Sequence, residues 1–232
     1  MPRKPGRRTP AERAGLLLFV TLILSAVYAL TRIIIPDPLS SQAAAYAQVR
    51  SDYVLKFIQC LLGLVVLSLP SIIGRKLKFD IPNFIYIMYY LFLYCAIFLG
   101  EVLNFYYVIP HWDVILHFFS GAMLGSLGFI LVSQLNDSKM IRVSLSPFFV
   151  ALFAFCFALS CGALWEIYEF VFDGILGLNM QKFMTATGEV LTGHQALHDT
   201  MTDLIVDSLA ALFTSLAGYS RLKAEQWFRK AD

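Results

Sequence analysis

The sequence predicts an all-α, polytopic membrane protein with six transmembrane helices and both termini in the cytoplasm. Of the 232 residues, 58% are hydrophobic and only 15% are charged, and the mean hydropathy is +0.68. Soluble domains average about 45–50% and about 25% for these two classes. A soluble fold could not cover this much apolar surface with so few charged side chains. Disorder is excluded as well, because it requires low hydrophobicity and a high net charge, and the net charge here is +2.

Six apolar runs are long enough to cross a hydrocarbon core of about 30 Å, which takes about 20 helical residues. They lie at Gly15–Ile35, Tyr53–Ile73, Asn83–Leu103, Val114–Leu135, Pro147–Phe172 and Thr200–Ser220. The runs are continuous rather than alternating, which favours helices over the strands of a barrel. We therefore expect a basic cytoplasmic tail at 1–14, one membrane domain at 15–220 and a second cytoplasmic tail at 221–232. The first run continues past the signal-peptide-like residues Val27 and Ala29, so we expect it to be retained.

The distribution of lysine and arginine sets the expected orientation. These residues gather in the two tails and in the second and fourth connections: Arg3, Lys4, Arg7, Arg8, Arg13, Arg75, Lys76, Lys78, Lys139, Arg142, Arg221, Lys223, Arg229 and Lys230. The connection 104–113 has none, and the connection 173–199 has only Lys182. Because positive residues stay on the cytoplasmic side, both termini are expected inside. The basic N-terminus is accordingly an orientation signal or a contact for anionic lipid, and no nucleic-acid partner is expected.

Ionisable residues inside the spans are the strongest functional signal. Seven of them lie in the outer halves of the last three spans or directly beside them: Asp113, His117, Glu166, Glu169, Asp199, Asp203 and Asp207. One such residue at mid-bilayer costs about 2.5–3.5 kcal/mol on insertion scales. Their spacing of three or four residues places each set on one face of its helix.

Small residues continue each polar stripe deeper into the membrane. Gly121 and Gly125 follow His117, and Ala211 and Ser215 follow Asp207. In the fifth span, Gly162, Ala158 and Ala154 lie on the inner side of Glu166. Small residues at four-residue spacing let helix backbones approach closely in lipid. We therefore expect the last three spans to pack through these faces and to surround a shared polar pocket at their outer ends.

The pocket predicts a metal site. Carboxylates with a histidine suit Zn²⁺, Mn²⁺ or Mg²⁺, and several acids crowded together require protons or cations. The expected ligands are Asp113, His117, Asp199, Asp203 and Asp207, with Glu166 or Glu169 as general base. A metal-bound water would serve hydrolysis or transfer on a lipid-linked or cell-envelope substrate. Two alternatives stay open: a proton- or cation-coupled transporter, and a structural polar network without catalysis.

The sequence gives weaker evidence of a functional role for the other polar residues and the cysteines. His194 and His198 either extend the metal site or are solvated, and Glu101 either joins the pocket or caps the third helix. His111 and Asp173 are expected at the membrane interface. The four cysteines (Cys60, Cys95, Cys156 and Cys161) lie within spans without a CxxC pair and are expected to be small buried hydrophobes.

Three short motifs resemble a known family. They are Asp113-x-x-x-His117-x-x-x-Gly121, Trp165-Glu166-x-x-Glu169, and Asp199-Thr200-x-x-Asp203-x-x-x-Asp207. They resemble the YjdF-type family of bacterial integral membrane proteins, and more remotely VanZ-type proteins, over residues 83–220. The resemblance implies a multi-pass protein of the bacterial plasma membrane, but it supplies no reaction. Asp207 stands where such spans often have asparagine, which makes this stripe more acidic.

The orientation is testable with topology reporters. A reporter fused after Asp232 should report a cytoplasmic position, and one inserted near Gly188 an external position, because the basic connections are retained inside. A cytoplasmic signal at Gly188 would contradict the whole arrangement.

Overall fold

The computed structural model describes residues 8–35, 43–77, 80–136, 145–185 and 188–231. Several residues on which the topology prediction depends lie outside the described residues: Arg3, Lys4, Arg7, Lys78, Lys139 and Arg142. The orientation of the termini stays a prediction.

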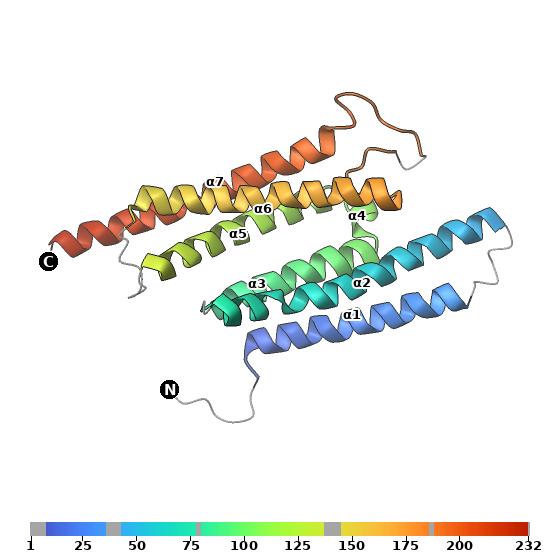
Figure 1. Cartoon of the computed structure of the whole chain (residues 1–232), viewed down its shortest axis with the longest axis horizontal. Helices are drawn as coiled ribbons and strands as arrows, with labels where there is room; N and C mark the ends of the chain where they lie inside the picture. Colours follow the sequence, from blue (N-terminus) through green and yellow to red (C-terminus); the bar gives the residue numbers. More distant parts are fainter. Residues whose placement is uncertain (1–7, 36–42, 78–79, 137–144, 186–187, 232) are drawn as a thin grey trace. The chain divides into compact units, whose positions relative to one another are not determined.

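The described residues are organised almost entirely as helices (Figure 1). In chain order they are α1 (Pro10–Ile34), α2 (Ala43–Leu77), α3 (Asn83–Leu93), the π-helix η1 (Tyr94–Val102), α4 (Phe105–Val108), α5 (Trp112–Asn136), α6 (Pro147–Leu176) and α7 (His198–Ala231). Within the described part of the chain, six helical segments are long and apolar enough to cross a membrane: Pro10–Ile34, Asp52–Lys76, Asn83–Val102, Trp112–Gln134, Pro147–Leu176 and His198–Gln226. The predicted all-α fold with six candidate spans is therefore confirmed.

Two helix ends differ from the predicted boundaries for local reasons. Helix α1 begins at Pro10 rather than at Gly15, because Thr9 and Glu12 form a capping box and proline is favoured in the first turn. Helix α7 continues through the predicted C-terminal tail to Ala231. No glycine or proline stops it after Ser220, and the ion pair between Arg221 and Glu225 stabilises the exposed turn.

The third span changes geometry partway along its length. After α3 the chain continues as η1, which ends where the backbone N–H of Leu103 donates to the carbonyl of Phe98, five residues earlier. Such wide turns leave carbonyl groups available to other donors. The carbonyl of Cys95 accepts a hydrogen bond from Trp112 Nε1 at 3.3 Å.

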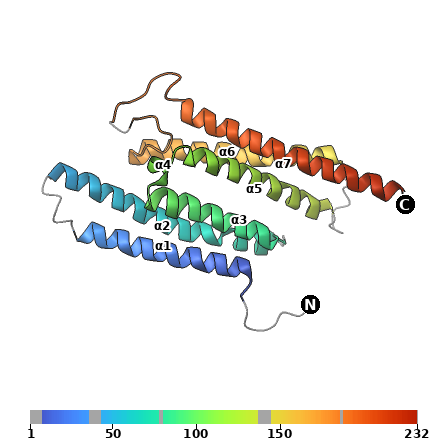
Figure 2. The same ribbon diagram turned by 180° about the vertical axis from the view of Figure 1, so that it is seen from behind.

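The chain divides into two compact units, residues 1–112 and 113–232. In the first unit, α1, α2 and α3 run side by side in both views (Figures 1 and 2). Its core is built from Leu18, Leu22, Ala26, Cys60 and Leu93. Cys60 is thus a buried hydrophobe as expected, whereas Cys156 of the second unit is exposed.

The second unit packs α5, α6 and α7 through their small residues. A Cβ placed on Gly121 of α5 would lie 3.0 Å from Ala210 Cβ of α7, and one on Gly128 would lie 2.9 Å from Ala154 Cα of α6. Gly121 and Ala154 of the expected small-residue faces thus make close helix contacts, although their partners Ala210 and Gly128 lie beside the predicted stripes. Large apolar side chains such as Phe170 and Phe213, each 69% exposed, cover the outside of these helices, as a lipid-facing surface requires.

A matched pair of substitutions tests this packing. Gly128→Ala should destabilise the protein by about 1–3 kcal/mol, because its new methyl group meets the backbone of α6. Gly174→Ala makes the same chemical change on α6, where nothing lies within 4 Å of the new atom. It should be neutral or stabilise the helix by up to about 1 kcal/mol. Thermal unfolding in detergent measures the stability of both variants. Equal melting temperatures would contradict the close approach of Gly128 to the backbone of α6.

Candidate functional site

The ionisable side chains of the last three helices gather around one histidine. Residues Asp113 and His117 lie one turn apart at the start of α5, Glu166 comes from α6, and Asp203 and Asp207 lie one turn apart on α7. An oxygen of each carboxylate lies between 3.2 and 3.9 Å from a ring nitrogen of His117. We call these five residues the His117 cluster. The sequence-predicted members His117, Glu166 and Asp203 are thus brought together.

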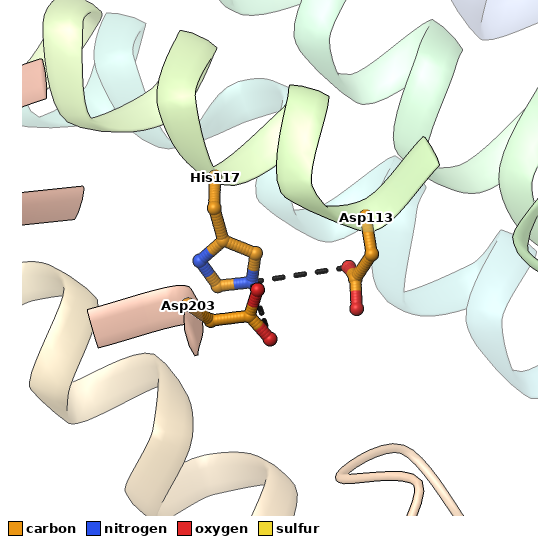
Figure 3. A group of neighbouring side chains, drawn as sticks. All are labelled: Asp113, His117 and Asp203. Carbon is orange, nitrogen blue, oxygen red and sulfur yellow. Dashed lines mark ion pairs between the residues drawn. The ribbon is translucent and has the colours of Figure 1, made fainter. Parts of the chain in front are cut away.

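Three carboxylate oxygens surround Nε2 of His117. Asp113 Oδ1 lies 3.8 Å from this nitrogen, and Glu166 Oε1 and Asp203 Oδ2 each lie 3.9 Å from it. Figure 3 shows the carboxylates of Asp113 and Asp203 approaching the same ring nitrogen of His117. These distances exceed the range of about 2.7–3.2 Å for an N–H···O hydrogen bond. The oxygens therefore point at a common region without bonding directly to the histidine.

The other ring nitrogen is held by Asp207. His117 Nδ1 lies 3.2 Å from Asp207 Oδ2, and both side chains are buried. When Nδ1 carries the proton of a neutral ring, its N–H donates a hydrogen bond to Asp207 Oδ2, and the Nε2 lone pair is then directed at the three carboxylates. Gly162 of α6 makes room for this contact, because a Cβ there would overlap Asp207 Oδ2.

Several of the carboxylate oxygens have no hydrogen-bond partner among the described residues. These buried oxygens without a partner are both oxygens of Glu166, both of Asp203, and Oδ1 of Asp207. Asp203 is 1% exposed and Glu166 is 4% exposed. A buried carboxylate that finds no donor is costly unless a proton or a cation compensates it. The buried acids of the cluster therefore require protons or a cation to compensate their charge.

Lys182 is the residue of this region to which the sequence analysis assigned no role. Its Nζ contacts Asp113 Oδ2 and lies 2.8 Å from Asp199 Oδ1. Burial opposes the positive charge, but Asp113 and Asp199 outweigh it and hold the pKa of the Lys182 ammonium above its ordinary value. The sequence signal for it is that Lys182 is the only lysine or arginine between positions 173 and 199. Asp199, a predicted metal ligand, is thus engaged by a lysine.

Asp173, at the end of α6, fixes the backbone that carries Lys182. Its Oδ1 accepts the N–H of Met180 at 2.8 Å, and its Oδ2 accepts that of Gln181 at 3.0 Å. The amide of Gln181 then donates to Thr200 Oγ1 on α7 at 2.8 Å. Asp173 is buried, and its carboxylate organises the loop rather than facing the cluster.

The remaining predicted residues lie elsewhere. Glu169 is buried one turn beyond Glu166, where its Oε1 accepts a hydrogen bond from Trp165 Nε1 at 2.8 Å. His194 and His198 are exposed, which agrees with solvated loop histidines, and His111 is exposed as well. Glu101 belongs to η1 of the first unit.

The geometry of three residues fits a metal ion. One ligand atom each from Asp113, His117 and Asp203 lies within 4.8 Å of the other two. Two tetrahedral zinc ligands at about 2.1 Å from the metal are about 3.4 Å apart. The observed separations of 3.8 and 3.9 Å from Nε2 need to close by only a few tenths of an ångström. A mixed nitrogen and oxygen donor set suits Zn²⁺ or Mn²⁺.

Comparison with protein families gives a match along nearly the whole chain. The family described as "Predicted membrane protein (DUF2238)" matches residues 16–224. The chain belongs to this family. Membership of DUF2238 agrees with the six candidate spans and establishes an integral, multi-pass membrane protein. The YjdF-type resemblance is consistent with it, and the VanZ-type likeness stays a prediction.

Among curated proteins, this DUF2238 member is similar to a protein of Thermotoga maritima described as uncharacterised. The two are 35% identical over 112 residues, which is 48% of this chain and 49% of the relative. The match thus spans about half the length of each protein. No solved structure matches the chain.

The role of Asp173 can be tested by hydrogen exchange. Asp173→Ala removes both acceptors, so the amides of Met180 and Gln181 should exchange faster while the helices keep their protection. Hydrogen–deuterium exchange with mass spectrometry measures this in detergent. Glu225→Gln, at an exposed site on α7, is the control. Unchanged exchange in Asp173→Ala would show that other contacts hold the loop.

Proposed function

We propose that this protein is a metal-dependent membrane enzyme that catalyses hydrolysis or group transfer at the His117 cluster. One observation carries the proposal. Three carboxylate oxygens surround Nε2 of His117 at 3.8–3.9 Å, while Asp207 holds the opposite ring nitrogen. Ordered histidine ligands of catalytic metals have this arrangement, in which a carboxylate on the far nitrogen orients the ring.

The geometry supports a distinct role for each side chain. Asp113, His117 and Asp203 are the proposed ligands, and a bound Zn²⁺ or Mn²⁺ would activate a water molecule. Glu166, whose oxygens have no partner among the described residues, is the proposed general base. Its neighbour Glu169 is less suited to that role because Trp165 already occupies one of its oxygens.

The proposed roles of two other acids differ from those that the sequence suggested. Asp207 contacts Nδ1 of His117 and so supports the orienting role rather than that of a ligand. Asp199 pairs with Lys182, which makes it a partner of the lysine. Both remain essential to the charge balance of the site in this proposal.

The substrate class follows from the expected orientation. The distribution of basic residues would put the cluster at the outer side of a bacterial plasma membrane. A site at that depth would lie near the level of the lipid head groups, which suits a lipid-linked or cell-envelope substrate. The lipid bilayer is thus both the solvent of the protein and the proposed source of its substrate.

The two alternatives are less well supported. A proton or cation path needs ionisable groups along the whole bundle, but beyond Asp207 the contacts of Gly121 and Gly125 of α5 with α7 involve Ala210 and Thr214, neither of which is ionisable. A purely structural network would pair its acids with donors, whereas both oxygens of Asp203 lack one among the described residues. Metal-assisted chemistry accounts for both features.

Metal content and chelator sensitivity test the proposal. Purified wild-type protein should contain about one equivalent of a divalent metal, and saturating metal should raise its melting temperature by about 5 °C or more. Asp203→Asn should lose the metal and the chelator response while the fold survives. Its metal-free form should be more stable than metal-free wild type, because repulsion among neighbouring carboxylates is relieved.

Glu225→Gln is the matched control, because it removes one negative charge from an exposed position on the same helix. It should retain the metal and the chelator response of wild type. If chelator changes the melting temperature of neither wild type nor Asp203→Asn, and neither contains metal, the metal-dependent enzyme is wrong. The polar network or the transporter would then be the better interpretation.

A further inference from the structure

Lys182 lies where a second cation would lie. Its Nζ contacts one oxygen of Asp113, while the other oxygen of Asp113 faces His117 Nε2. Asp113 is thus shared between the ammonium group and the proposed metal position. In two-metal sites a carboxylate commonly bridges two cations that are about 3.5–4 Å apart. The second carboxylate on the ammonium is Asp199, whose Oδ2 is buried without a partner among the described residues.

The backbone around Lys182 is held firmly in an unfavourable conformation. Lys182 has φ +49°, in the left-handed region that is unfavourable for a non-glycine residue. Asp173 fixes the two preceding N–H groups, and the side chain of Asn179 bonds to both the N–H and the C=O of Met184. A strained residue persists only where its surroundings determine it. Here they direct the ammonium group onto Asp113 and Asp199.

Charge provides the reason for a fixed cation. The His117 cluster and Asp199 together hold five carboxylates, of which Asp203 and Glu166 are nearly fully buried. One divalent ion with a neutral histidine leaves this group strongly negative. A mobile second ion would be lost whenever its concentration fell, whereas an ammonium group on the chain is always present.

We propose that Lys182 is a tethered cation that occupies the second cation position of a two-cation carboxylate site. This inference rests on the proposed function, because it places the divalent ion at Asp113, His117 and Asp203. Lys182 is a positioning residue: it acts through Asp113 and limits the site to one divalent ion. Without the ammonium group, Asp113 and Asp199 present oxygens that suit a second, hydrated Mn²⁺ ion.

The test counts Mn²⁺ ions bound to the full-length protein in detergent. Wild type should bind one equivalent of Mn²⁺, and Lys182→Ala should bind two. The two ions of the variant would share Asp113, so its electron paramagnetic resonance spectrum should show a coupled pair. Lys182→Gly is a second variant that removes the same charge and suits the left-handed backbone, so the result does not depend on the folding of the alanine variant.

Two control variants separate charge from structure. Lys182→Arg keeps the positive charge and should bind one equivalent, as wild type does. Lys223→Ala removes a lysine near the end of α7, where it lies over the ring of Tyr219, and should also leave the count at one. A merely structural role of Lys182 would change the melting temperature without changing the number of ions.

The outcomes are distinct. One equivalent in Lys182→Ala and Lys182→Gly, at any affinity, would overturn the tethered cation while leaving the metal site intact. Two equivalents of Mn²⁺ in wild type would also overturn the tethered cation, because the Lys182 ammonium group would then not occupy the second cation position. If wild type binds no Mn²⁺, Zn²⁺ or Mg²⁺, the proposed function itself fails.

Discussion

The contact between Asp207 and His117 Nδ1 determines the arrangement of the second unit. It requires α5 and α7 to approach closely, and Gly121 provides that approach next to the Asp207 backbone. It also requires α6 to lack a side chain where the carboxylate lies, which Gly162 provides. The same helix contacts therefore form both the polar site and the apolar packing. Glycines in the bundle stabilise the helix contacts and leave space for a buried acid at the same time.

The sequence predicts the membrane fold well because bilayer thickness imposes a strong constraint on length and composition. The predicted span Pro147–Phe172 begins where α6 begins and ends four residues before α6 does. Local signals beyond hydropathy were missed, such as the capping box at Thr9 and the π-helical turns after Leu93. Capping adjusts an end by a few residues, and a π-helix has no distinctive composition, so neither follows from an apolar run.

The site was predictable only as far as helical periodicity reaches. Spacing on α5 and α7 placed His117 and Asp203 on polar faces, and the small-residue stripes indicated that these faces meet. Periodicity does not specify which atom faces which, so Asp207 was grouped with the ligands although it contacts the far ring nitrogen. Lys182 lies in a loop, where neither spacing nor hydropathy fixes a position, and its place depends on hydrogen bonds to Asp173.

The order of the helices has a consequence for how the protein is assembled. Asp113 and His117 enter the membrane with α5, but Lys182 and Asp207, which contact them, are synthesised about seventy to ninety residues later. Until α6 and α7 follow, α5 is a helix with two polar groups and no acids from those helices beside them. Helices with such faces are poorly matched to lipid on their own. The nascent chain must therefore keep α5 sheltered from lipid, or near the polar surface, until the last helix arrives.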